Sequence, residues 1–217
     1  MQESRYEVQG IRQLTASAYA VRLNRNGLDF RAGQHITLGL INEVECREYS
    51  IYSGEQDDYI EVLVKTVENG NISKKLKQVQ PGDLLNFDGP VGYFTLDDND
   101  IENNRRFIFI GSGTGIAPFR SFVKSYPGLN YTLLHGVRYA HEAYDRQDYH
   151  PESHILCTSR DKKGDFNGRI TQYLKENIHD TSAQYYLCGN INMIYEAFDL
   201  LQLKGVPSNQ LHAEVYF

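Results

Sequence analysis

Tryptophan is absent from this sequence and cysteine occurs only three times, which excludes several kinds of protein. Cys46, Cys157 and Cys188 stand far apart, and their spacing fits neither a zinc site nor a disulfide framework. We therefore expect reduced thiols and no bound metal. No stretch approaches the ~20 apolar residues that a membrane span needs, and the first residues lack the apolar segment of a leader peptide. These absences predict a cytoplasmic protein that does not bind membranes.

Blocks of like charge are also missing. The 22 Lys and Arg residues against 28 Asp and Glu residues give a net charge of −6, and no run of five or six like charges occurs. Such a chain is a poor general binder of nucleic acids, so any anion site has to be local. Up to residue 100 there are 10 basic and 16 acidic residues, and beyond it 12 of each, which indicates two segments of different chemistry.

Short alternating segments fill the first half and are typical of a closed antiparallel β-barrel. Strands are predicted over residues 19–24, 35–40, 47–52, 59–67 and 84–89, and one helix over 72–79. The run 97–104 is polar and lacks periodicity, so it is interpreted as a linker. The predicted domains are therefore 1–100 and 101–217.

Strands alternate with helices in the second half, the pattern of an α/β domain with a parallel sheet and helices on both faces. Strands are predicted over residues 106–110, 131–136, 154–158 and 185–188. Helices are predicted over residues 118–124, 170–177 and 191–204.

A glycine-rich turn follows the first strand of this half. Glycines 111, 113 and 115 let the backbone turn sharply and approach a ligand, and Pro118 suits a first helical turn. The N–H groups at that helix end favour a pyrophosphate. The spacing departs from GxGxxG because Ile116 takes the place of the third glycine, so a purely structural turn stays an alternative.

Three arginines fall where parallel strands end or helices begin, the edge at which such sheets bind ligands. They are Arg138, Arg160 and Arg169. Each alone could be an ordinary surface arginine. If they converge, the ligand carries an extra phosphate, and NADP(H) fits better than NAD(H).

The segment Arg47-Glu48-Tyr49-Ser50 lies in a predicted strand, with Arg47 and Tyr49 on one face and Ser50 on the other. A cation for a pyrophosphate, a ring for stacking and a hydroxyl for a ring nitrogen would suit a flavin. An ordinary strand with exposed polar residues is the alternative.

Taken in order, the motifs resemble those of one family. Besides Arg47 to Ser50, they are the segments 63–65, 70–73 and 89–94, the turn 113–118, Tyr186-Leu187-Cys188-Gly189-Asn190 and the ending Glu214-Val215-Tyr216-Phe217. Through nearly its whole length the sequence resembles the ferredoxin/flavodoxin-NADP(+) reductase family, in its bacterial branch. The resemblance implies an FAD-binding barrel followed by an NADP-binding α/β domain.

The resemblance also implies roles for single residues at the flavin. Arg47 would neutralise the FAD pyrophosphate, Tyr49 would stack on the isoalloxazine, and Ser50 would hydrogen-bond near its N5 atom. Further FAD contacts are implied for Leu63, Val64, Lys65, Asn71, Ile72, Ser73 and Thr114. Tyr216 would cover the other flavin face, and Phe217 would approach the adenine.

At the nicotinamide dinucleotide, Gly113, Thr114 and Gly115 would bind the pyrophosphate. The 2′-phosphate would be held by Arg138, Ser159, Arg160 and Arg169, with Asp161 where the branch has Glu. Cys188 and Gly189 would lie beside the nicotinamide, and Glu214 would help to poise hydride or proton transfer. Ser50, Cys188, Glu214 and Tyr216 are thus the expected catalytic residues.

The implied activity is hydride transfer from NADPH to FAD and then single-electron transfer to ferredoxin or flavodoxin, by a monomer. The three cysteines lack the spacing of an iron–sulfur cluster, so the electrons must leave to another molecule. Two alternatives stay open. One is an NAD(P)H-dependent flavin reductase component that feeds an oxygenase iron–sulfur protein or another acceptor. The other is a flavin-binding regulatory or electron-bifurcating subunit, against which the three arginines argue.

Overall fold

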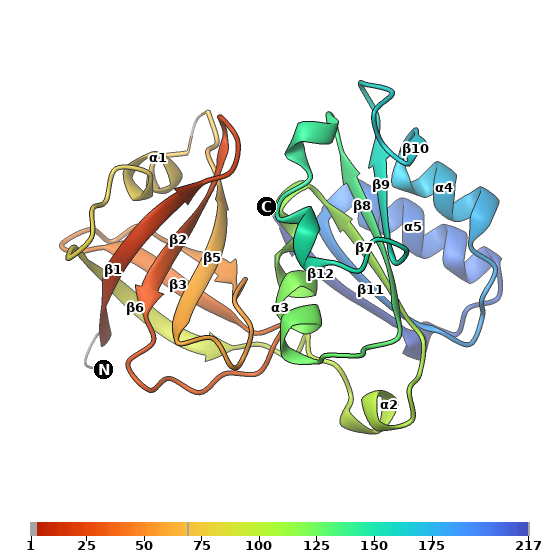
Figure 1. Cartoon of the computed structure of the whole chain (residues 1–217), viewed down its shortest axis with the longest axis horizontal. Helices are drawn as coiled ribbons and strands as arrows, with labels where there is room; N and C mark the ends of the chain where they lie inside the picture. The colour runs from red at the N-terminus through yellow and green to blue at the C-terminus, as the bar shows by residue number, and fades with distance from the viewer. Residues whose placement is uncertain (1–3, 69, 217) are drawn as a thin grey trace. The chain divides into compact units, whose positions relative to one another are not determined.

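The computed structural model describes residues 4–68 and 70–216, and the chain divides into two compact units. The barrel unit comprises residues 1–95 together with 120–125, and the sheet unit comprises 96–119 and 126–217 (Figure 1). Within the described residues, no helix is both long and apolar enough to cross a membrane.

An antiparallel barrel forms the first unit. Its strands are β1 (Ser4–Gln13), β2 (Ala18–Asn24), β3 (His35–Leu40), β4 (Cys46–Ser50), β5 (Tyr59–Lys65) and β6 (Leu84–Val91). They pair in the order β4-β3-β6-β1-β2-β5. Beyond β4, Ile51 forms a bridge to Val62 of β5, and the Tyr52 N–H donates to the Glu61 carbonyl at 2.7 Å. These contacts join the two edge strands, so the predicted barrel is confirmed.

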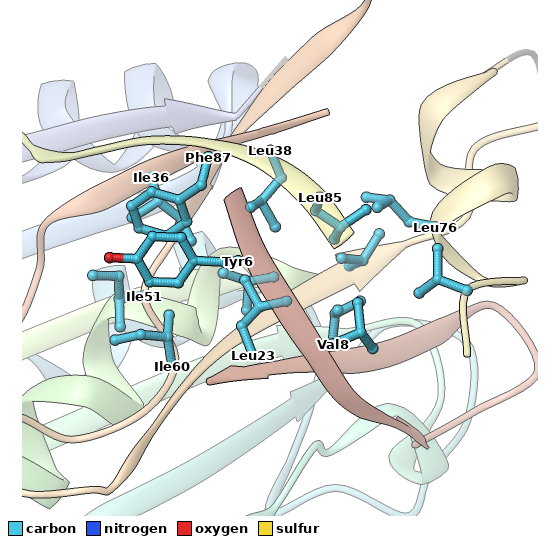
Figure 2. Packing of buried hydrophobic residues seen from close by; sticks show 14 of the residues in the cluster. Tyr6, Val8, Leu23, Ile36, Leu38, Ile51, Ile60, Leu76, Leu85 and Phe87 are labelled. Carbon is cyan, nitrogen blue, oxygen red and sulfur yellow. The ribbon is translucent and has the colours of Figure 1, made fainter. Parts of the chain in front are cut away.

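The barrel core is built from alternating positions of these strands. Figure 2 shows Tyr6 of β1 against Phe87 of β6, with ring centroids 3.9 Å apart. Strand β1 was not predicted, because its sequence is mostly polar and only Tyr6 and Val8 are fully turned inward. A register shift between Val8 and Gly10 interrupts its alternation further.

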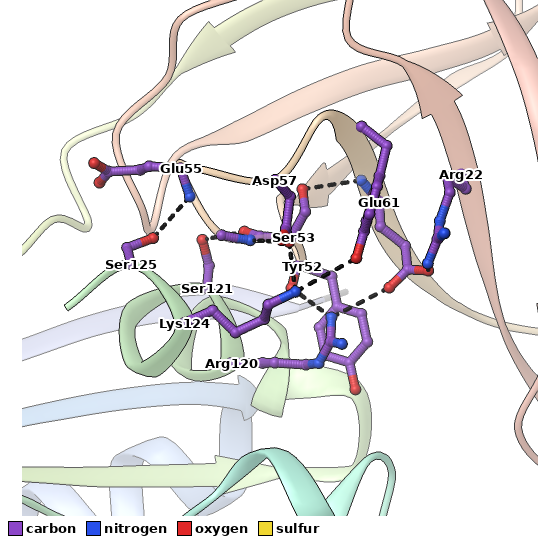
Figure 3. A network of polar contacts seen from close by, with 12 residues as sticks. Arg22, Tyr52, Ser53, Glu55, Asp57, Glu61, Arg120, Ser121, Lys124 and Ser125 are labelled. Atoms are coloured by element: carbon purple, nitrogen blue, oxygen red, sulfur yellow. Dashed lines mark hydrogen bonds and ion pairs between the residues drawn. The ribbon is translucent and has the colours of Figure 1, made fainter. Parts of the chain in front are cut away.

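Residues 120–125 belong to the barrel unit through polar contacts (Figure 3). The Arg120 guanidinium lies 3.0 Å from the Tyr52 carbonyl and 3.2 Å from the Glu61 carboxylate. The Ser121 hydroxyl donates to the Ser53 carbonyl at 2.7 Å. Partners so far apart in sequence left no signal from which this assignment could be predicted.

A parallel sheet forms the second unit, which confirms the predicted α/β class. Its strands are β7 (Phe107–Ser112), β8 (Tyr131–Val137), β9 (His154–Thr158), β10 (Phe166–Asn167), β11 (Gln184–Asn190) and β12 (Leu211–Tyr216), in the order β10-β9-β8-β7-β11-β12. Helices α4 (Ile170–Asn177) and α5 (Ile191–Leu203) pack on the face that carries Ile108, Leu134 and Leu187. On the opposite face, Phe119 stacks on Phe109 at 5.0 Å.

Two helices differ most from the prediction. Helix α1 (Ile72–Leu76) ends three residues earlier than expected, at a C-cap on Lys77. Helix α2 (Asp98–Glu102) lies inside the predicted linker and has no buried residue. Its N-cap is Asp97, whose carboxylate accepts from the Asn99 and Asp100 N–H groups. Capping rather than an apolar face therefore stabilises α2, which is why hydrophobic periodicity did not reveal it.

The remaining short elements are 3₁₀ turns. They are η1 (Gly113–Ile116), η2 (Ala140–Glu142), η3 (Arg146–Asp148) and η4 (Ser208–Gln210), and η1 leads into helix α3 (Ala117–Ser125).

Candidate functional site

The order of the parallel strands makes the ends of β7 and β11 the candidate ligand site. From β7 the chain moves to β8 and β9 on one side, and it then returns to β11 on the other. Open sheets of this kind bind ligands where the order reverses, outside the carboxyl ends of the strands. The glycine-rich turn 113–116 follows β7 at this point, and Cys188 and Gly189 lie near the end of β11.

Two glycines of the turn, Gly113 and Gly115, differ in the space around them. Gly113 has φ +56°, and a Cβ added there would meet no atom within 4 Å, so this side of the turn is open. A Cβ on Gly115 would lie 2.4 Å from the Cys188 carbonyl oxygen, so this residue packs directly on β11. The turn is therefore held closely against the sheet and presents its Gly113 side outward. The order of strand, glycine-rich turn and helix is as predicted, except that the α-helix begins at Ala117, one residue before Pro118.

The turn η1 leads directly into the nine-residue helix α3, and the Ala117 N–H already donates to the Thr114 carbonyl. The N–H groups that a helix start leaves without helical partners therefore belong to η1, where they carry a partial positive charge. An anionic pyrophosphate is the kind of ligand that such a turn and helix start favour.

The four residues predicted to hold a 2′-phosphate come together in the sheet unit. Arg138 follows β8, Ser159 and Arg160 follow β9, and Arg169 is the N-cap of α4. The Arg160 N–H donates to the Arg138 carbonyl at 2.9 Å, and the Ser159 N–H donates to the Val137 carbonyl at 3.1 Å.

Arg169 is tied to the same place through its neighbour. The Gly168 N–H donates to the Thr158 carbonyl at 2.9 Å, directly before Ser159. Arg138, Ser159, Arg160 and Arg169 are all exposed. Their backbones thus converge at one edge of the sheet, with side chains open to a ligand.

Two carboxylates hold the loops of the phosphate cluster, which consists of Arg138, Ser159, Arg160 and Arg169 and is named for its predicted ligand. Glu142 Oε2 accepts from the N–H groups of Arg138 and Tyr139, both at 2.9 Å. Asp161 Oδ2 accepts from the Ala140 N–H at 2.9 Å, and this hydrogen bond is the main cause that lowers the Asp161 pKa. Sequence reasoning missed Glu142, although its position three residues after Tyr139 matches the spacing of a capping box.

The predicted nicotinamide residues lie side by side on β11 and β12. Cys188 pairs with Glu214 in the parallel register, and Asn190 pairs with Tyr216. The Cys188 thiol is buried and donates to Glu214 Oε2 at 4.0 Å. Burial, and then the Glu214 carboxylate, raise the pKa of this thiol well above its usual value. Cys188 therefore stays protonated, which fits a contact residue rather than a nucleophile.

Gly189 is required by the same arrangement. It has φ +121°, and an added Cβ would lie 2.4 Å from the Ser112 hydroxyl oxygen. That hydroxyl accepts from the Asn190 N–H at 2.9 Å, which ties the ends of β7 and β11 together. Ser112 was not singled out from the sequence.

In the barrel unit, strand β4 presents the three predicted flavin residues at different depths. Arg47 is exposed, Tyr49 is partly buried against the barrel core, and Ser50 is buried. Burial raises the pKa of Tyr49 to about 12 although Arg47 lowers it, so the ring stays neutral.

Glu45 joins two of the expected pyrophosphate contacts. Its Oε1 lies 3.0 Å from the Arg47 guanidinium, and its Oε2 accepts from the Asn71 side-chain amide at 2.9 Å. The structure therefore brings Arg47 and Asn71 together around the Glu45 carboxylate. Glu45 was not predicted, because nothing in its local sequence marks it.

The other expected FAD contacts differ in burial, and one of them lies outside the described residues. Ile72 and Val64 belong to the barrel core, Leu63 is buried, and Lys65 is exposed. The Ser73 hydroxyl accepts from the Val67 N–H at 3.2 Å, and the Ser73 carbonyl accepts from the Tyr19 hydroxyl. These side chains serve the barrel, so flavin contacts there would fall to the backbone. Thr114 lies in η1, and Phe217 lies outside the described residues.

Comparisons with known proteins agree with both units. Residues 12–96 match the family described as oxidoreductase FAD-binding domain, and residues 109–198 match the oxidoreductase NAD-binding domain. The flavodoxin/ferredoxin–NADP reductase of Buchnera aphidicola is 27% identical over 226 residues, which cover 88% of this chain and 87% of the relative. The toluate 1,2-dioxygenase electron transfer component of Pseudomonas putida is 26% identical over 220 residues, with 93% of this chain and 64% of the relative covered.

Among solved structures, a ferredoxin NADP+ reductase from Neisseria gonorrhoeae with bound FAD and NADP has a TM-score of 0.87 and 22% identity. The match covers 100% of both chains. Other relatives are longer: the chain spans about half the length of the curated flavohemoproteins that it matches, 52% in two of them.

Proposed function

Because the chain belongs to the ferredoxin reductase-type family of FAD- and NAD-binding oxidoreductases, we propose that it oxidises NADPH and passes single electrons to a ferredoxin or flavodoxin. In this proposal residues 1–100 bind FAD and residues 101–217 bind NADP(H). The observation that carries the choice of NADPH is the convergence of Arg138, Ser159, Arg160 and Arg169 at one edge of the sheet.

The phosphate cluster supports NADPH over NADH because the two differ only in the 2′-phosphate. Guanidinium groups bind phosphate oxygens through paired hydrogen bonds, and three exposed arginines with a serine supply a full set of donors. The Gly113 side of the turn is open, and it would take the pyrophosphate at the start of α3.

In the barrel unit, Arg47 and Asn71 would hold the FAD pyrophosphate, since both already bind one carboxylate. The neutral Tyr49 ring would stack on the flavin, and the Ser50 hydroxyl would donate to it. The bound flavin and nicotinamide supply the hydride and electron chemistry. The chain would bind and orient them. At the predicted nicotinamide contact, the Cys188 thiol donates its hydrogen bond to Glu214.

This proposal is tested first on the purified protein and its flavin. We expect a yellow protein with bound FAD, whose absorbance near 450 nm is bleached rapidly by NADPH and slowly by NADH. Anaerobic stopped-flow spectroscopy measures both rates. Equal rates with the two nucleotides, or a colourless protein after gentle purification, would contradict the proposal.

A second candidate differs only in the electron acceptor. The chain aligns with an electron transfer component of toluate 1,2-dioxygenase over 93% of its length, which favours a reductase that feeds an oxygenase iron–sulfur protein. Steady-state assays with a ferredoxin, a flavodoxin and a Rieske-type oxygenase protein, at equal concentrations, separate the two. The preferred acceptor has the highest kcat/KM. A protein that binds FAD and NADPH but reduces none of them would support the regulatory-subunit alternative.

A further inference from the structure

His135 of β8 makes a contact that no motif predicted. Its imidazole is completely buried, and Nε2 lies 3.0 Å from the carbonyl oxygen of Gly113, in the pyrophosphate turn. In the parallel register, His135 is the partner of Gly111, the residue two positions before Gly113. A single buried side chain thus connects strand β8 to the turn that follows β7.

The chemistry of the contact determines where its proton lies. A carbonyl oxygen only accepts, so Nε2 must carry the hydrogen and donate it. Burial, and then the neighbouring His154, lower the pKa of His135 to about 3. The ring is therefore neutral, with its one proton on Nε2. Within the described residues Nδ1 has no hydrogen-bond partner, so the Gly113 carbonyl is the contact that selects this tautomer.

The direction of the Gly113 carbonyl also determines the direction of the Thr114 N–H in the same peptide group. In a trans peptide group the C=O and the following N–H point in opposite directions. The Gly113 carbonyl is directed toward the buried ring, so the Thr114 N–H is directed away from it. Gly113 has φ +56°, and a Cβ added there would meet no atom of the described residues within 4 Å. Because glycine adopts many backbone conformations readily, a contact to its carbonyl helps to hold this one.

We propose that His135 is a positioning residue that sets the direction of the Thr114 N–H for the pyrophosphate of NADP(H). The inference rests on the proposed function, because it assigns the turn to that ligand. His135 does not touch the ligand, and it acts through the Gly113–Thr114 peptide group.

His154 provides a matched control for the loss of a buried histidine. It is also buried, its ring centroid lies 5.8 Å from that of His135, and neither of its ring nitrogens has a hydrogen-bond partner among the described residues. Replacing it removes a similar ring from the same cluster without removing a contact to the turn.

The test compares two ligands on the FAD-loaded protein by titration calorimetry. NADP+ carries both the pyrophosphate and the 2′-phosphate, whereas 2′-AMP carries only the 2′-phosphate. We expect His135→Phe to raise the Kd for NADP+ about tenfold and to leave the Kd for 2′-AMP within twofold, since one oriented hydrogen bond is lost. His135→Gln retains an N–H donor and should recover most of the NADP+ affinity. His154→Phe should leave both Kd values within twofold.

Each other outcome contradicts a specific statement. If His135→Phe binds NADP+ as the wild type does, or if both ligands weaken equally, the positioning role is wrong. If the wild type binds neither ligand, the proposed function itself is wrong. Should His135→Phe fail to fold, His135→Met serves as the donor-free variant, and the same comparison with His135→Gln decides the matter.

Discussion

The exposed side chain of Arg160 is carried by a backbone that hydrogen bonds hold in position. Its backbone N–H donates to Arg138, and the next residue, Asp161, accepts from the Ala140 N–H. The loops after β8 and β9 are thereby joined on both sides of the arginine. A flexible side chain on a held backbone suits phosphate binding, because less entropy is lost when the hydrogen bonds form.

We expect Arg160→Ala to raise the KM for NADPH by about tenfold or more, with the KM for NADH nearly unchanged, because a charge-assisted hydrogen bond contributes about 1.5–3 kcal/mol. Steady-state kinetics with both nucleotides measure this. Arg106→Ala is the matched control, since Arg106 is half-exposed but precedes β7, at the opposite edge of the sheet. A uniform loss with NADPH and NADH would show that Arg160 does not bind the 2′-phosphate.

At the level of the elements, an ion cluster around a buried glutamate connects four segments of the barrel unit. Glu61 of β5 is completely buried, and its carboxylate lies within 3.0–3.2 Å of Arg12, Arg22 and Arg120. Arg22 lies over the Tyr59 ring at 3.6 Å, and Arg120 lies over the Tyr52 ring at 4.2 Å. The cluster joins strands β1, β2 and β5 to residues 120–125. Figure 3 shows Arg22, Glu61 and Arg120 of this cluster.

Glu61→Gln should lower the free energy of unfolding by about 3 kcal/mol, because it leaves the buried Arg120 guanidinium without its counter-charge. Urea unfolding followed by circular dichroism measures the change. Lys75→Ala breaks the half-exposed pair with Glu43, at 2.7 Å, and should cost less than about 1 kcal/mol. Equal effects of the two substitutions would mean that the buried cluster adds no particular stability.

At the level of the whole molecule, two buried histidines make the free energy of unfolding depend on pH. Burial is the main cause that lowers the pKa of His135 to about 3 and of His154 to about 4. In the unfolded chain both would titrate near the ordinary value of about 6.5. The unfolded state therefore binds more protons than the folded state between these limits.

The free energy of unfolding should consequently fall as the pH drops from about 6.5 to about 4, by up to about 1.4 kcal/mol per pH unit for each histidine. Above pH 7 these two histidines should no longer make the free energy of unfolding change with pH. Urea unfolding at a series of pH values measures the dependence, and His154→Phe should reduce the slope by the share of one histidine. An unchanged slope in that variant would contradict the link.

Local sequence determined much of the secondary structure and the identity of the motif residues. The spans predicted for β3, β9 and α4 agree with the observed bounds, because alternating or helical apolar positions there match the buried face. The arginines at 138, 160 and 169 were singled out because strand ends are recognisable in sequence.

Only the tertiary structure decided which side chains hold those residues in place. Glu45, Glu61, Arg120 and His135 act through partners on other elements. His135 meets Gly113 only because β7 and β8 pair in one register, and Glu61 meets Arg120 only once the barrel has formed. Such contacts leave no local pattern, since burial and register come from the packing of the whole chain.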